Sequence, residues 1–224
     1  MTTRRLLLCG VIAGPLFTAV LIGQDLTRAH FDPMRHPGSS LAIGDWGWIQ
    51  ILNFLVCGAL TVAYAVGVRG SLRERGRTSF WGPLLIGVWG VGLIGAGVFV
   101  ADPIGGYPPG TPPSGVHTWH GQLHDVPFSV VAFLAMPVLF FVFARRFFGW
   151  REPVWGFVSL VTGLLVLAGF LLFGTGFDQQ ASALSEIAGL LQRITIVVAW
   201  TWLTALAIHL RRAAEGEKVS AVRR

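Results

Sequence analysis

Six long apolar segments alternate with short polar stretches along the 224-residue chain. Each is close to the ~20 residues that an α-helix needs to cross the hydrocarbon core of a bilayer. Because a chain in lipid must satisfy its own backbone hydrogen bonds, we expect all six segments to be helices. The predicted transmembrane helices cover residues 6–24, 47–68, 80–101, 125–144, 153–175 and 187–210. The pattern predicts an all-α, polytopic membrane protein, with one six-helix bundle over residues 1–212 and a disordered tail at 213–224.

The charged residues, only 12% of the chain, follow this alternation. Fourteen of the seventeen Lys and Arg residues lie before the first segment, in the second and fourth connections, or after the last segment. The exceptions are Arg28 and Arg35 in the other loops and Arg193 inside the last segment. The positive-inside rule then predicts a plasma-membrane protein with both termini in the cytoplasm. The same clustering explains the net charge of +6 as a topology signal, so we expect no nucleic-acid partner.

Candidate chemistry gathers in the stretch SGVHTWHGQLHDVPF, residues 114–128. On a helix, His117, His120 and His124 would share one face. Such a face can hold a metal such as zinc, with Asp102 from the preceding helix completing the ligand set. It can also hold a base oriented by a carboxylate. The alternative is a polar loop in which Asp125 is the N-cap of a helix that begins there.

Arg193 lies about two turns inside the last apolar segment, where a charged side chain is costly and normally paired or functional. We expect a structural ion pair, a lipid-phosphate contact, or a side chain that extends to the headgroups. The carboxylates considered as its partners are Glu186, Asp102, Asp125 and Asp178. We predict that Asp102, His124 and Arg193 approach one another in a cavity that opens to the outside.

Three sequence blocks together resemble one family of bacterial and archaeal membrane proteins, catalogued as domain of unknown function 998. The blocks are ADP…GTPPS…TWHGQLHD, FLAMPVLFFVFARRF and GLLQRITIVVAW, and the likeness runs from about residue 6 to 212. The positions that match are Asp102, His124 and Arg193. The resemblance implies a six-helix membrane fold and brings no activity or substrate with it.

Three hypotheses for the function follow. In the first, an accessory membrane protein binds a lipid headgroup or small molecule in an outward-facing polar pocket formed by Arg193 and the carboxylates. In the second, the protein is a metal-dependent lipid hydrolase in which His120, His124 and Asp102 hold the metal, Asp125 is the base and Arg193 steadies a phosphate. In the third, Asp102, His124 and Arg193 relay protons in a transporter. The inner halves of the apolar segments carry few polar residues, so the third is the weakest. Whether the protein is an enzyme stays open, and the first hypothesis is the one we favour.

Overall fold

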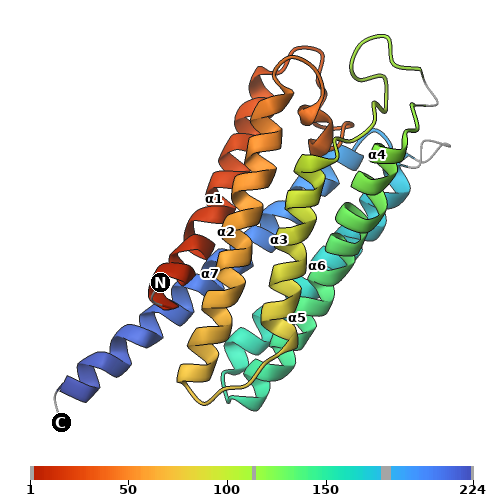
Figure 1. Cartoon of the computed structure of the whole chain (residues 1–224). Helices are drawn as coiled ribbons and strands as arrows, with labels where there is room; N and C mark the ends of the chain where they lie inside the picture. The colour runs from red at the N-terminus through yellow and green to blue at the C-terminus, as the bar shows by residue number, and fades with distance from the viewer. Residues whose placement is uncertain (1–2, 113–114, 178–182, 223–224) are drawn as a thin grey trace.

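Helices make up most of the computed structural model, which describes residues 3–112, 115–177 and 183–222, with side chains as far as residue 213 (Figure 1). The long helices are α1 (Thr3–Thr27), α2 (Gly47–Glu74), α3 (Trp81–Val98), α5 (Val131–Gly149), α6 (Pro153–Phe177) and α7 (Ala188–Val222). Three short helices complete the chain: η1 (Gly38–Ala42), α4 (Trp119–Leu123) and the π-helix η2 (His124–Val130). α4, η2 and α5 run on as one span, so six helices are long and apolar enough to cross a membrane. The predicted all-α, six-span fold is confirmed.

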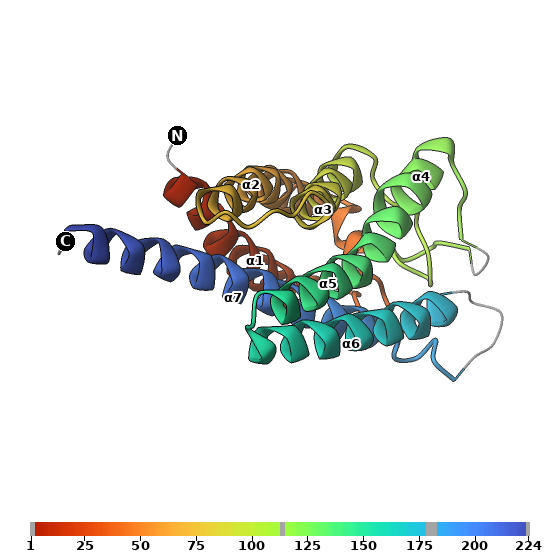
Figure 2. The same cartoon turned by 90° about the horizontal axis from the view of Figure 1, so that it is seen from below.

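The six spans form a ring, because each packs chiefly against two neighbours (Figures 1 and 2). Its order is α1, α2, α3, α5, α6 and α7, and α7 closes it against α1. Residues 28–46, 99–112 and 115–118 cover one end of the ring, which we call the loop end. The opposite end, here the arginine-rich end, carries the α2–α3 and α5–α6 connections and both described ends of the chain (Figure 1).

The fourth span begins earlier than the sequence predicts. Thr118 is its N-cap, since the Thr118 hydroxyl accepts a hydrogen bond from the backbone N–H of Gly121 at 3.1 Å. The interpretation of Asp125 as the cap is therefore wrong, because Asp125 lies inside the π-helix. The π-turn accommodates Pro127, which has no N–H to continue the α-helical pattern. At the other end of the chain, α7 is helical as far as Val222, and disorder from residue 213 stays a prediction.

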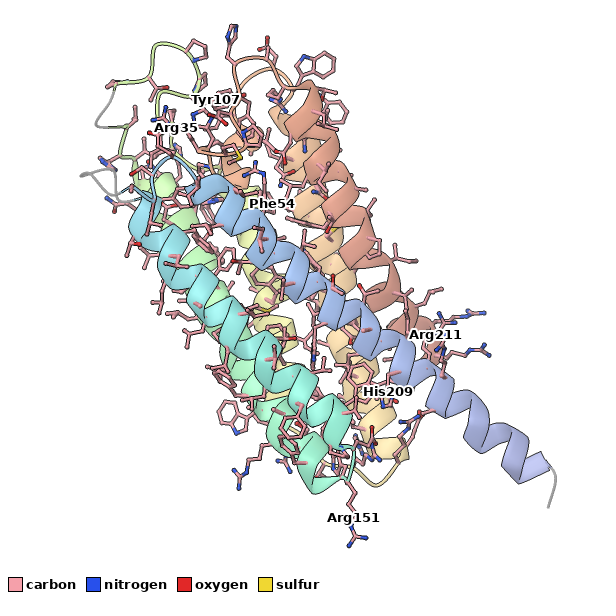
Figure 3. All side chains as sticks on the ribbon, turned by 180° about the vertical axis from the view of Figure 1, so that it is seen from behind. Arg35, Phe54, Tyr107, Arg151, His209 and Arg211 are labelled. Atoms are coloured by element: carbon pink, nitrogen blue, oxygen red, sulfur yellow. The ribbon has the colours of Figure 1, made fainter. Side chains whose placement is uncertain are left out.

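A cluster at the arginine-rich end holds three elements together. Glu152 lies between α5 and α6. Its Oε1 forms an ion pair with Arg77 Nη1 at 2.6 Å, and its Oε2 lies 3.0 Å from His209 Nε2 of α7. The Arg77 guanidinium also lies 4.8 Å from the ring centre of Trp150, a cation–π contact. Figure 3 shows His209 at this end, with Tyr107 and Arg35 at the loop end. The cluster joins both arginine-rich connections to the last span.

Candidate functional site

Arg193 of α7 forms an ion pair with Asp25, near the end of α1. The pair is bidentate: Arg193 Nε donates to Asp25 Oδ2 and Arg193 Nη2 donates to Asp25 Oδ1, each at 2.7 Å. The two side chains are only 10% and 8% exposed. Arg193 Nη1 donates to the backbone oxygens of His36 and Gly189, at 2.9 and 3.0 Å. The guanidinium is thus almost fully used in joining α7 to α1 and to the loop after α1.

The ion-pair partner of Arg193 is not one of the four carboxylates that the sequence analysis considered. Glu186 lies instead near the side chain of Arg35, at 3.4 Å, and both of these groups are well exposed. Asp102 binds Thr118, and no contact joins Asp125 to Arg193 among the residues that the structure describes. Asp178 lies outside the described residues. Of the three expectations for Arg193, the ion pair is the one that the geometry supports.

The loop after α1 is fastened by a neutral imidazole. The backbone N–H of Asp32 donates to His36 Nδ1 at 2.9 Å, so the ring proton is on Nε2, which donates to the backbone oxygen of Gly105 at 3.1 Å. The ring packs against Phe31 and Tyr107, with centroids 5.3 and 5.4 Å away. Burial, together with the positive charges of Arg35 and Arg193, lowers the pKa of His36, although the Gly105 bond and Asp32 raise it.

A cavity of about 380 Å³ lies in the ring at the loop end. Every span contributes to its wall, including Leu21 of α1, Gln50 of α2, Leu93 of α3, Phe133 of α5, Phe173 of α6 and Ile196 of α7. Phenylalanines make up much of the apolar part of the wall. The polar part includes Asp102, His117, His124 and Asp125. A cavity of this size and character is typical of sites for small molecules or lipid segments.

Asp102 and His124 both line this cavity, and Arg193 does not. Asp102 accepts hydrogen bonds from the backbone N–H and the hydroxyl of Thr118, at 2.6 and 2.7 Å. A Cβ atom on Gly121 would overlap its carboxylate, so the carboxylate lies against the first turn of α4, where the helix dipole favours negative charge. The predicted meeting of all three residues is therefore only partly realised: two share a cavity wall and the third is held elsewhere.

His124, at the start of η2, is 2% exposed and has a fixed orientation. Its Nδ1 lies 2.7 Å from the backbone oxygen of Phe99 and 3.2 Å from that of Ala96. A carbonyl oxygen only accepts, so Nδ1 carries the proton and the neutral ring presents an unprotonated Nε2. Nε2 makes no hydrogen bond with the described residues. The structure thus supplies the oriented imidazole that the sequence suggested, held by backbone carbonyls in place of a carboxylate.

The other two histidines do not complete a metal site. His117 is exposed and precedes the helix, whereas His120 is half-buried and its Nδ1 lies 3.1 Å from the Thr118 hydroxyl. Within the described part of the chain, no group of three His, Cys, Asp or Glu side chains is placed to hold a metal ion. The proposed zinc site of His117, His120, His124 and Asp102 therefore has no assembled ligand set there.

Comparison with known proteins identifies the family. The model of the family described as "Protein of unknown function (DUF998)" matches residues 11–209. The chain belongs to the DUF998 family. The match confirms the resemblance drawn from the three sequence blocks. No curated protein and no solved structure matches the chain.

Sequence reasoning missed the polar network between α1 and α2 of this DUF998 protein. Arg28 Nη2 donates to Gln24 Oε1 at 3.0 Å, and Gln24 Nε2 donates to Gln50 Oε1 at 2.8 Å. Asn53 Nδ2 is 3.3 Å from the same Gln50 oxygen. The signal was present, because Gln24, Gln50 and Asn53 are amides inside or beside predicted spans. Buried amides in a membrane protein normally mark packing or ligand contacts.

Proposed function

We propose that this DUF998 protein is an accessory protein of the cell membrane that binds an amphipathic lipid in its central cavity. The observation that carries the proposal is the cavity itself, a mostly apolar space of about 380 Å³ inside the ring, lined by all six spans. Close packing normally fills a bundle of this kind with side chains. Here the centre is left open at one end, and polar groups are concentrated there.

A route for the lipid leads between η2 and α6. The chief packing partners of η2 are α3, α4 and α5, so α6 supports it little. Three wall residues in this region are exposed: Asp125 and Val130 of η2 and Gly174 of α6. An ideal Cβ on Gly174 has no atom of the described residues within 4 Å. A lipid in the surrounding leaflet would therefore meet the cavity wall directly at these exposed residues.

Binding suits these side chains better than the hydrolase hypothesis. That hypothesis assigned a phosphate to Arg193, whose guanidinium is already held by Asp25 and two backbone oxygens. It assigned a ligand role to Asp102, both of whose carboxylate oxygens accept hydrogen bonds from Thr118. A binding protein needs neither group to be free. Asp102 instead stabilises the start of the fourth span and thereby the cavity wall.

The orientation in the membrane is part of the proposal. The arginine-rich end is placed in the cytoplasm because fourteen of the seventeen basic residues belong to its loops and tails. The loop end and the cavity then face outward, and membrane lipids of the outer leaflet are the expected partners.

The test is lipid retention by the full-length protein purified in mild detergent. Bound lipid is extracted and quantified by mass spectrometry for wild type, Gly174→Phe and Gly23→Phe. Gly23 is a matched control, because it is also an exposed helical glycine with no atom within 4 Å of an ideal Cβ, but it does not line the cavity. We expect wild type and Gly23→Phe to retain a defined lipid that Gly174→Phe loses. Equal lipid content in all three proteins would contradict the proposal.

A further inference from the structure

The cavity wall contains a hydrogen-bond acceptor whose direction is fixed. His124 must donate its Nδ1 proton to the backbone oxygens of Phe99 and Ala96, so its Nε2 is left with a lone pair. His124 is 2% exposed and lines the cavity, and its Nε2 has no partner among the described residues. A ligand that carries a hydroxyl group would supply the missing donor.

The wall also contains a hydrogen-bond donor whose direction is fixed. Hydrogen bonds that link three side chains in series, those of Arg28, Gln24 and Gln50, fix it. An arginine can only donate, so Gln24 must turn its oxygen toward Arg28 and its nitrogen toward Gln50. Gln50 must then present its oxygen to Gln24, and its own amide nitrogen points away from the chain. Gln50 is fully buried and lines the cavity, and its Nε2 has no hydrogen-bond partner among the residues that the structure describes. A carbonyl oxygen of a ligand would satisfy it.

Within the described part of the chain, two further cavity-lining residues have buried polar atoms without hydrogen-bond partners. They are the Ser40 hydroxyl of η1 and the Trp89 indole nitrogen of α3. Leaving such groups unpaired in an apolar interior is costly, and native proteins do so rarely. Two donors and a hydroxyl without partners beside one cavity indicate a ligand with several acceptor oxygens.

The charge of the wall limits the ligand further. Among the described residues, the wall contains two carboxylates, Asp102 and Asp125, and no Lys or Arg. Two arginines at the loop end are already engaged, Arg193 by Asp25 and Arg28 by Gln24 and two backbone oxygens. An anion in this apolar space would have no cation to compensate its lost hydration. A lipid phosphate is therefore disfavoured.

From these observations we infer that the cavity selects an uncharged lipid with one hydroxyl group and ester carbonyls, the chemistry of a diacylglycerol. The hydroxyl donates to His124 Nε2, and the ester carbonyls accept from Gln50, Ser40 and Trp89. The acyl chains lie against the phenylalanines and leave between η2 and α6. This inference rests on the proposed function and names the ligand class of the same cavity.

Four short-chain probes separate the parts of this inference. Dioctanoylglycerol has both the hydroxyl and the esters, its dialkyl ether keeps the hydroxyl without carbonyls, and its acetylated form keeps the esters without a hydroxyl. Dioctanoyl phosphatidic acid adds the charge. Affinities are measured by thermophoresis of the full-length protein in detergent. For wild type we expect dioctanoylglycerol to bind best. It should bind about 2- to 10-fold more tightly than the acetylated form, which lacks one hydrogen bond, and should exceed the ether, which lacks several, by a larger factor. Phosphatidic acid should bind more weakly still.

Variants then assign each preference to its residue. His124→Phe should bind dioctanoylglycerol and its acetylated form equally. Ser40→Ala and Trp89→Phe should each narrow the preference for ester over ether by about 2- to 10-fold. Trp200→Phe is the matched control, because Trp200 also has a buried indole nitrogen without a partner but does not line the cavity. Its preferences should equal those of wild type.

The outcomes separate the inference from the proposed function. The inference and the proposed function are both supported by one result. The hydroxyl preference is lost in His124→Phe, the ester preference is narrowed in Ser40→Ala and Trp89→Phe, and both preferences persist in Trp200→Phe. A wild type that retains a lipid lost in Gly174→Phe, but binds the ether or phosphatidic acid as tightly as dioctanoylglycerol, would overturn the inference alone. Equal lipid retention by wild type and Gly174→Phe would overturn the proposed function and the inference with it. Should His124→Phe fail to fold, the ester-to-ether comparison in Ser40→Ala and Trp89→Phe decides the question.

Discussion

The two sides of the loop end treat charged and titratable groups in opposite ways. Between α1, α2 and α7, Arg193 is matched by Asp25 and Arg28 by Gln24 and backbone oxygens. Between α3, η2 and α6, His124 keeps one ring nitrogen without a protein partner and Asp125 is exposed on the cavity rim. The first side is a scaffold whose charged groups are paired within the protein. The second side leaves a ring nitrogen and a carboxylate that a ligand in the cavity can contact.

The difference shows how a membrane bundle can keep an open centre. A cavity removes packing contacts and lowers stability. The paired charges, the cation–π contact of Arg193 with Phe31 at 5.5 Å and the His36 bonds hold the loop end together on the other side. We therefore expect the largest losses of stability from substitutions on the scaffold side, and effects on lipid binding from substitutions on the cavity side.

The largest effect should come from Arg193→Ala, which leaves Asp25 buried without a counter-charge. Breaking a buried pair in this way costs roughly 3–5 kcal/mol in the free energy of unfolding. The measurement is unfolding in a denaturing detergent titration. Arg35→Ala is the control, because the Arg35–Glu186 pair is 49% and 67% exposed and should be worth about 1 kcal/mol or less. Equal losses in the two variants would mean that the paired scaffold contributes nothing special.

A smaller loss is expected from Gly95→Ala, on the cavity side between α3 and η2. A Cβ on Gly95 would overlap the Phe128 ring, and Phe128 lines the cavity. Overpacking of this kind costs roughly 1–3 kcal/mol. It should also reduce lipid retention. In Gly87→Ala the nearest atom is 3.9 Å from the new Cβ, so that variant should be neutral or stabilised by up to about 1 kcal/mol. A Gly95→Ala protein as stable as Gly87→Ala would show that α3 and η2 are not closely packed.

Thr118→Ala should have the next effect, because Thr118 caps the fourth span and holds Asp102. Loss of an N-cap side chain costs about 1 kcal/mol. Thr118→Ser keeps the hydroxyl and should unfold at nearly the wild-type denaturant concentration. If serine behaved like alanine, the cap would not be the source of the stability.

The smallest effect should be a pH dependence from His36, whose pKa is lowered in the folded protein. Below pH 6.5 the unfolded chain binds the proton and the folded chain does not, so stability falls as the pH drops from about 6.5 to the folded pKa and is level below it. His36→Gln should be less stable at pH 8 and lack this part of the decline. Parallel stability curves for the two proteins between pH 8 and 5 would contradict the assignment.

The chain's own pattern predicted the spans and the grouping of basic residues, because lipid imposes a length and a polarity on each segment. It did not predict Asp25 as the partner of Arg193. The two residues are 168 positions apart, and their contact depends on α7 closing the ring against α1. Helix periodicity defines a face within one helix and cannot say which other helix covers it.

The sequence pattern also could not predict at which residue the fourth span begins. Thr118 and Asp125 are both good N-cap residues, seven positions apart, and Pro127 suits a first turn. The choice was made by a tertiary contact, since Asp102 binds Thr118 and its carboxylate lies against the first turn at Gly121. Pro127 then falls within the helix, and the π-turn accommodates it.

The central claim is that a lipid enters the ring, and quenching of Trp89 fluorescence tests it most directly. Trp89 lines the cavity and is 3% exposed, so a lipid that stays outside the bundle meets little of it. The emission of Trp89 is obtained as the difference between wild type and Trp89→Phe, during titration with a diacylglycerol that carries brominated chains. The account predicts saturable quenching of this difference signal, which Gly174→Phe weakens and Gly23→Phe does not. A signal that the brominated lipid leaves unchanged at saturation would contradict it.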